Sequence, residues 1–165
     1  MATTTLGGNP VQTVGELPTV GQPSPHLELT KADLTEITND DLAGKRVVLN
    51  IFPSIDTQVC ATSTRKFNEL AANLDNTVVI CASADLPFAL NRFCGAEGLS
   101  NVVTGSSFRS DFGSAFGVTM ADGRLAGLLA RAVVVLDEAG TVVYTHLCDA
   151  ISDEPDYDGA IAALG

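Results

Sequence analysis

Three short apolar runs rich in β-branched residues mark the regular parts of the chain. They are VVLNIF at 47–52, TVVIC at 77–81 and AVVVL at 132–136. Because these runs are almost uninterrupted by polar residues, they are typical of central strands covered on both faces of a sheet. A fourth run, TVVYTHL at 141–147, follows the turn residues of 137–140 and predicts an antiparallel hairpin with the run before it.

Between the strands, apolar residues recur with the spacing of amphipathic helices. The first stripe, at i, i+3, i+4 and i+7, consists of Phe67, Leu70, Ala71 and Leu74. It predicts a helix between the first two strands. A second helix is predicted over 86–93, because Asp85 and Pro87 suit a helix start and Gly95 suits its end. The residues after Pro155 predict a short terminal helix.

This order of elements predicts an α/β fold whose early strands run parallel through right-handed crossovers. Residues 4–14 are expected to add an amino-terminal hairpin, and the Pro- and Gly-rich segment 17–25 to connect it to the rest. The chain has no internal repeat and no domain linker. We therefore expect residues 1–165 to form a single domain.

Composition narrows the classes of function. The chain has 20 acidic and 9 basic residues, a formal charge of −11, and no basic cluster, which argues against nucleic acids and anionic membranes as partners. No apolar run is long enough to cross a membrane, and residues 1–10 lack the features of a secretory signal. Four cysteines are too few for a disulfide scaffold, so we expect a cytoplasmic protein with reduced thiols.

Cys60 is the first candidate for chemistry because of its position. The segment PSIDTQVC at 53–60 lies between a buried strand and a helix, where ligands bind in open α/β sheets. If Asp56 or Thr57 caps the helix, Cys60 falls in its first turn, where free N–H groups and the helix dipole favour a thiolate. Thr57 can then turn its hydroxyl toward whatever the sulfur attacks. The alternative is a small buried cysteine with Thr57 acting only as a cap.

The remaining candidates are more ambiguous. Cys94, near the end of the second helix, is either a second redox thiol or a core residue. Cys81 ends a buried strand and should pack there. Cys148 follows the last strand and is harder to place, a surface thiol open to oxidation being one alternative. Arg131 opens a strand after a long apolar stretch. A guanidinium in such a place requires an anionic partner. The candidates are a thiolate, a bound oxygen substrate and a structural carboxylate.

Other catalytic or ligand-binding patterns are missing. Only two histidines are present, and His26 stands in the Pro-rich connector, so a Cys/His dyad has little support. The cysteines lack the close pairs of a zinc site, and no Gly-rich loop for phosphates occurs. The sequence therefore predicts neither a metal nor an organic cofactor.

Several blocks of sequence carry a family resemblance. They are NIFPSIDTQVCATSTRKFN at 50–68, ADLPFALNRFCGAEG at 84–98, ADG at 121–123, AGLLARAVVVL at 126–136 and the connector VGELPTVGQPSP at 14–25. In this order they resemble the bacterial thiol peroxidases, a subfamily of the peroxiredoxins. The resemblance covers nearly the whole chain. It implies a thioredoxin-like fold with an added amino-terminal β-hairpin, a homodimer, and reduction of hydroperoxides with thioredoxin as the reductant and no cofactor.

The resemblance also implies residue roles. Cys60 corresponds to the peroxidatic cysteine and Cys94 to the resolving cysteine, while Pro53, Thr57 and Arg131 correspond to residues that line the peroxide pocket. The Cys60 thiolate would attack the peroxide and become a sulfenic acid, which Cys94 would convert to an intrachain disulfide. Since both cysteines stand at helix ends, we expect disulfide formation to require local unfolding.

Two other functions remain open on the sequence alone. The segment CATS at 60–63 is a CxxS at a helix start, which is compatible with a thiol–disulfide oxidoreductase. A redox-sensing or holdase module could instead use a disulfide between Cys60 and Cys94 as a switch. The sequence offers no long exposed apolar segment for such a module.

Overall fold

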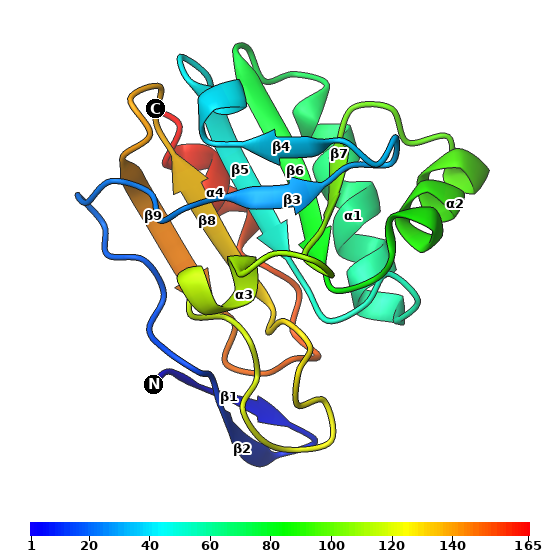
Figure 1. Ribbon diagram of the computed structural model, residues 1–165, viewed down its shortest axis with the longest axis vertical. Coiled ribbons are helices and arrows are strands. Elements are labelled where there is room, and N and C mark those ends of the chain that lie inside the picture. The colour runs from blue at the N-terminus through cyan, green and yellow to red at the C-terminus, as the bar shows by residue number, and fades with distance from the viewer.

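A seven-stranded mixed sheet forms the centre of the computed structural model, which describes residues 1–165 (Figure 1). In spatial order its strands are β4 (Glu36–Thr38), β3 (Glu28–Thr30), β7 (Val103–Ser106), β6 (Thr77–Ser83), β5 (Arg46–Ile51), β8 (Ala132–Leu136) and β9 (Val142–Leu147). Strands β5, β6 and β7 run parallel, and the other neighbours are antiparallel. The predicted α/β class, the parallel early strands and the β8–β9 hairpin are confirmed.

The central strands are buried on both faces, as their apolar runs predict. In β5, Val47 and Leu49 join a large core cluster on one face, while Val48 joins the cluster on the other face. All of β8 is buried as well. This alternation is the two-residue period of a strand, so Asn50 faces the same side as Val48.

Two helices cover the second of these faces. Helix α1 (Gln58–Ala71) contributes Phe67, and helix α4 (Tyr157–Ala162) contributes Ala160, to the cluster around Val48. On the opposite face, Phe112 of the short helix α3 (Phe112–Ala115) joins the large core cluster, as does Leu42 of the 3-10 turn Asp40–Leu42. The first helix and the terminal helix are both confirmed, although the predicted stripe outruns the first helix: Leu74 packs on the same cluster from beyond its end at Ala71.

Helix α2 (Pro87–Glu97) is longer than predicted. The expected stop at Gly95 is wrong, since this glycine keeps a helical conformation. The helix ends at Gly98, whose φ of +67° is readily adopted by glycine. The Gly98 N–H donates to the carbonyls of Cys94 and Gly95. The extra turn carries Cys94 into the body of the helix rather than its end.

The predicted amino-terminal hairpin is present and projects from the main sheet (Figure 1). Strands β1 (Thr3–Leu6) and β2 (Asn9–Gln12) pair across a tight turn at Gly7 and Gly8, both of which have positive φ. Hydrogen bonds between the backbones of Thr5 and the segment 149–151 fix the hairpin to the chain after β9. No helix of the structure has the length and apolar character needed to cross a membrane.

Candidate active site

The loop between β5 and α1 is held from outside by Asp85. The Asp85 carboxylate accepts hydrogen bonds from Ser54 Oγ at 2.8 Å and from the backbone N–H of Ile55 at 2.7 Å. The prediction that Asp85 helps to start α2 is therefore wrong. Leu86 occupies the N-cap position and makes no side-chain cap. The Asp85 carboxylate accepts hydrogen bonds from the loop before α1 instead.

Thr57 is the N-cap residue of α1, and of the two predicted N-cap residues, Asp56 and Thr57, it is therefore the second that holds this position. Its backbone is extended there, and its side chain makes no cap bond. The Oγ1 hydroxyl donates instead to the carbonyl of Ser54 at 2.9 Å, which tightens the turn before the helix. Cys60 consequently stands in the first turn, as its third residue.

Cys60 and Arg131 form the centre of the site. Cys60 is fully buried, and Arg131 is 1% exposed. The Nη2 atom of Arg131 donates to Cys60 Sγ at 3.1 Å, and its Nε atom donates to the carbonyl of Ile151 at 2.7 Å. Arg131 takes part in none of the ion pairs of the structure. Of the anions considered for Arg131, the structure thus brings the sulfur to it and places a charged hydrogen-bond donor against the atom that would react.

A cavity of about 230 Å³ opens beside this pair. Its lining residues are Leu6, Pro53, Thr57, Gln58, Val59, Leu125, Arg131, Ile151 and Ser152. The three residues that the resemblance assigns to a peroxide pocket, Pro53, Thr57 and Arg131, therefore line one cavity. The Nη1 atom of Arg131 is buried and has no hydrogen-bond partner, so the guanidinium keeps a free donor.

Sequence reasoning missed the apolar wall of this cavity. Leu6 comes from the hairpin, Leu125 from the long loop before β8, and Ile151 from the segment after β9. Docking of the hairpin on that last segment brings Leu6 to the cavity. No local pattern marks these residues, since each becomes part of the site only through contacts between distant segments.

Cys94 lies apart from this cavity. Its half-buried side chain lines another cavity of about 310 Å³ together with residues such as Lys31, Asn91 and Val102, and no residue lines both cavities. All four cysteines are free thiols, and burial raises the pKa of Cys94. In this conformation Cys94 thus lines a cavity apart from the one beside Arg131, while the fully buried Cys60 lines neither.

The other two cysteines are buried. Cys81 packs inside β6, where burial raises its pKa to about 12, and its predicted packing role is confirmed. The alternative that Cys148 is a surface thiol is wrong. Cys148 is 1% exposed, because its N–H extends the β8–β9 pairing to the carbonyl of Arg131 and its own carbonyl accepts from Thr4 Oγ1. Burial raises the pKa of Cys148 to about 11.

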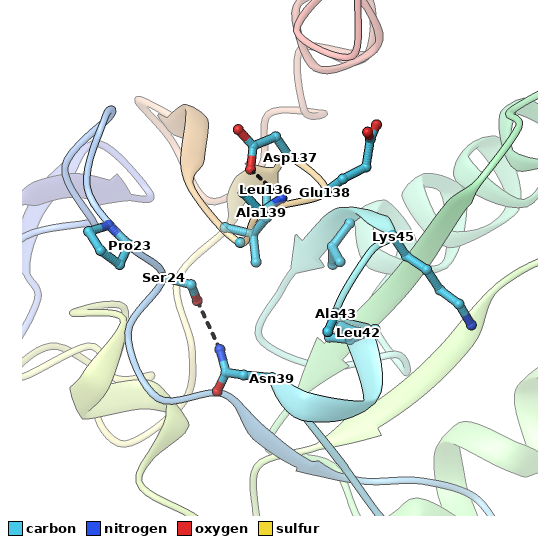
Figure 2. Close-up of a pocket in the computed structure, with 12 residues that line it drawn as sticks. Pro23, Ser24, Asn39, Leu42, Ala43, Lys45, Leu136, Asp137, Glu138 and Ala139 are labelled. Carbon is cyan, nitrogen blue, oxygen red and sulfur yellow. Dashed lines mark hydrogen bonds between the residues drawn. The ribbon is translucent and has the colours of Figure 1, made fainter.

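A third cavity, of about 300 Å³, lies near the beginning of β5, whereas Cys60 follows its end (Figure 2). Leu42, Lys45 and Leu136 are among its lining residues, and Asn39 donates to Ser24 at its edge, at 3.3 Å. No cysteine or histidine lines it. The structure also contains no group of three or more His, Cys, Asp or Glu side chains placed to hold a metal ion.

Known proteins share this sequence and architecture. The sequence pattern of the family described as Redoxin matches residues 19–161. The chain is 57% identical over 165 residues to the thiol peroxidase of Mycobacterium tuberculosis, covering 100% of this chain and 99% of that protein. It is 56% identical over 164 residues to the thiol peroxidase of Corynebacterium glutamicum, covering 99% of each.

Solved structures agree with these relatives. The fold matches the crystal structure of a peroxiredoxin-like protein from Aquifex aeolicus with a TM-score of 0.93 and 39% identity, over 98% of this chain and 95% of that one. This likeness confirms the thioredoxin-like fold of the peroxiredoxin type, with its added hairpin. The chain therefore belongs to the Redoxin family and, within it, to the bacterial thiol peroxidases, which are thiol-dependent peroxidases.

Proposed function

We propose that this thiol peroxidase reduces hydrogen peroxide and organic hydroperoxides at Cys60, with Cys94 as the resolving cysteine and thioredoxin as the reductant. The observation that carries the proposal is the 3.1 Å hydrogen bond from Arg131 to the Cys60 sulfur, beside a cavity that Pro53 and Thr57 also line. A buried cation, a sulfur in the first turn of a helix and an adjoining cavity are the parts that peroxide reduction by a thiol requires.

In the first step, the Cys60 thiolate attacks the nearer oxygen of the hydroperoxide. A bond forms between sulfur and oxygen, the O–O bond breaks, and the leaving alkoxide or hydroxide takes up a proton to become an alcohol or water. Negative charge spreads over both oxygens in the transition state. Arg131 can stabilise that charge without moving, because its Nη1 donor is free and its Nε atom is fixed on Ile151. Cys60 is left as a sulfenic acid.

In the second step, the Cys94 sulfur attacks the sulfur of the sulfenic acid. A disulfide forms within the chain and water leaves. Because Cys60 is fully buried and Cys94 faces a different cavity, this step requires the first turn of α1, part of α2, or both to loosen. Exchange with thioredoxin through a mixed disulfide then restores the two thiols. Neither step needs a metal or an organic cofactor.

The cavity walls favour organic substrates besides hydrogen peroxide. Leu6, Val59, Leu125 and Ile151 give the cavity an apolar side, and Arg131 supplies a charged end. An alkyl or aryl group can therefore lie against the leucines while the peroxide oxygens face the guanidinium. Burial of that group would add binding free energy that hydrogen peroxide cannot gain.

The assembly is proposed to be a homodimer formed beside the active-site loop. Leu86, Phe88 and Phe108 are 52%, 66% and 45% exposed, which is unusual for side chains of this size. Ser106 donates to the carbonyl of Asp85, which brings the segments that bear these side chains together, and Asp85 in turn binds the loop before α1. A second copy of the chain would cover this apolar patch. We further propose a single domain over residues 1–165 and a cytoplasmic location, where the thiols stay reduced.

The alternative functions have less support. A thiol–disulfide oxidoreductase of the CxxS type needs its cysteine within reach of another protein, whereas Cys60 is fully buried and Ser63 donates to the carbonyl of Cys60 inside the helix. A small peroxide in the cavity beside Arg131 needs a smaller opening of the turn to meet the sulfur than a protein partner does. Once a second copy covers the patch of Leu86, Phe88 and Phe108, little exposed apolar surface is left for a holdase.

Mass mapping of disulfides after one equivalent of peroxide tests the proposal. We expect one link between Cys60 and Cys94 in the wild type, no peroxide-dependent link in Cys60→Ser, and a sulfenic or further oxidised Cys60 in Cys94→Ser. A wild type that joins Cys60 to Cys81 or Cys148, or whose Cys60→Ser variant still consumes peroxide, would contradict it.

A further inference from the structure

An amide side chain is buried in the central strand of the sheet. Asn50 in β5 is 0% exposed and lies between the apolar residues Leu49 and Ile51. Its Nδ2 atom donates to Ser63 Oγ at 3.3 Å and to Cys81 Sγ at 3.6 Å, whereas its Oδ1 atom has no partner. Burying a partly unsatisfied amide costs stability compared with an apolar side chain of similar size. Packing therefore does not explain why this position holds Asn.

The hydrogen bonds of Asn50 lead to the active-site turn. Ser63 Oγ, which accepts from Asn50, donates to the carbonyl oxygen of Cys60 at 3.0 Å, and Thr64 Oγ1 donates to the same oxygen at 3.0 Å. Asn50, Ser63, Thr64 and Cys60 are all fully buried. A chain of polar contacts thus connects the rigid central strand to the backbone of the residue that carries the reactive sulfur.

We infer that Asn50 is a positioning residue which, through Ser63, determines how readily the Cys60 turn leaves its folded position. The inference rests on the proposed function. A sulfenic acid held in the folded turn stays next to Arg131 and the cavity, where a second hydroperoxide can oxidise it to a sulfinic acid and leave as an alcohol or water. The same sulfenic acid forms the disulfide with Cys94, with release of water, only when the turn loosens.

The contacts of Asn50 therefore set the ratio of sulfinic acid to disulfide that each turnover produces. Since one hydrogen bond stabilises a folded state by about 1 kcal/mol, loss of the bond between Asn50 and Ser63 should favour the loosened turn about fivefold. The rate of the first oxidation should change little, because Asn50 makes no hydrogen bond to the Cys60 sulfur and does not line the cavity.

The test compares Asn50→Leu, Ser63→Ala and the double variant with the wild type. Each is oxidised with graded peroxide while thioredoxin and its reductase keep the cycle running, and sulfinic acid at Cys60 is counted per turnover by mass spectrometry. We expect about fivefold less sulfinic acid in either single variant. The double variant should show little further change, because both substitutions break one chain of contacts.

A second buried position provides the control for general destabilisation. Val135 in β8 belongs to the same apolar cluster as Val48 and is not part of the chain of hydrogen bonds, so Val135→Ala should lower stability and leave the ratio unchanged. If Asn50→Leu does not fold, Ser63→Ala still tests the inference, since alanine is well suited to a helix interior. An unchanged ratio in Ser63→Ala, or an equal shift in Val135→Ala, would overturn the inference.

The two proposals fail differently. If the wild type forms no disulfide between Cys60 and Cys94, the proposed function is wrong and the role of Asn50 is wrong with it. If the wild type forms that disulfide and the ratio does not respond to the Ser63 substitution, only the role of Asn50 is wrong.

Discussion

The Nη2 atom of Arg131 lies 3.1 Å from the Sγ atom of Cys60, although the two residues are 71 positions apart in the chain. The pairing depends on the sheet. Strand β8, which Arg131 precedes, pairs antiparallel with β5, and the loop after β5 leads into α1. The last residue of β5 therefore lies opposite the first residue of β8, and the guanidinium meets the first turn of the helix. With no carboxylate to neutralise it, the full charge of Arg131 acts on the sulfur and its cavity.

The apolar wall of the cavity should distinguish organic substrates from hydrogen peroxide. Replacing Leu125 by Asp puts a charge where an alkyl or aryl group would lie. We expect kcat/KM for cumene hydroperoxide to fall about tenfold, the loss of roughly 1–2 kcal/mol of apolar contact, with a much smaller fall for hydrogen peroxide. Steady-state kinetics with the two substrates measure the difference.

Val20→Asp is the matched control, since Val20 is an exposed apolar residue of the connector and does not line the cavity. It should leave both values of kcat/KM unchanged. Equal losses for the two peroxides in Leu125→Asp would mean that the leucine supports the fold rather than the substrate.

The loop before α1 should depend on Asp85. The variant Asp85→Ala removes the acceptor of Ser54 Oγ and of the Ile55 N–H. Because hydrogen bonds to a charged group stabilise a protein by about 1.5–3 kcal/mol each, we expect the free energy of unfolding to drop by about 2 kcal/mol or more. Oxidation of Cys60 in a single turnover should slow about tenfold, because the turn that presents the sulfur is less well fixed.

Asp41→Ala provides the comparison for that substitution. Asp41 also accepts from a backbone N–H and a hydroxyl, both of Thr38, but at an exposed site in the 3-10 turn. Its loss should leave the oxidation of Cys60 at the wild-type rate. If Asp85→Ala oxidises Cys60 at the wild-type rate, or if Asp41→Ala slows this oxidation as much as Asp85→Ala does, the reaction has no specific dependence on the Asp85 carboxylate.

The buried thiol of Cys81 should make the protein less stable at alkaline pH. Burial raises its pKa from the ordinary 9.0 to about 12 in the folded protein. Stability from the neutral thiol is therefore fully present below pH 9 and is lost as the pH rises from 9 to about 12, because there the unfolded chain binds fewer protons. Between pH 7.5 and 10.5 the loss due to this group is about 2 kcal/mol.

Urea unfolding under reducing conditions at these two pH values measures the effect. Cys81→Ala should lose about 2 kcal/mol less than the wild type over the same interval. Val79→Ala, a buried substitution in the same strand without a titrating group, should lose as much as the wild type. Identical losses in all three proteins would mean that Cys81 titrates alike in the folded and unfolded states.

The patch around Phe88 should control assembly. A charge at this position opposes burial against a second copy, so Phe88→Glu should convert the proposed dimer into a monomer in sedimentation equilibrium at micromolar concentration. Val20→Glu, at an exposed apolar residue outside the patch, should remain dimeric. A wild type that sediments as a monomer would refute the proposed dimer.

The long elements follow from local patterns, and the short ones do not. Strands β5, β6 and β8 have apolar runs, and α1 has an apolar stripe. Such side chains leave water only when the strands and the helix pack together. Strands β3, β4 and β7 have three or four residues each and were not predicted. Strand β3 pairs with β4 over only three positions and joins the rest of the sheet through one pair, Thr30 with Ser106, so its local pattern is too short to mark it.

The site divides in the same way. Pro53, Thr57 and Cys60 come together because they are close in the chain, and the apolar context of Arg131 predicts its burial. Its partner is not predictable from spacing: the residues left a thiolate, an oxygen substrate and a carboxylate open, and the resemblance placed Arg131 only in the peroxide pocket. Cys148 was hard to place because the hairpin that covers it lies at the other end of the chain.

The central claim is that the guanidinium of Arg131 makes Cys60 reactive toward peroxide. Stopped-flow measurement of a single turnover at pH 7 tests it directly, using the wild type, Arg131→Met and, as the control, Arg124→Met at an exposed arginine of the loop before β8. Loss of one charged donor to the developing oxyanion costs about 100-fold or more in rate. We predict that second-order oxidation of Cys60 slows by at least that factor in a folded Arg131→Met and is unchanged in Arg124→Met. A folded Arg131→Met that reacts within about threefold of the wild type would contradict the account.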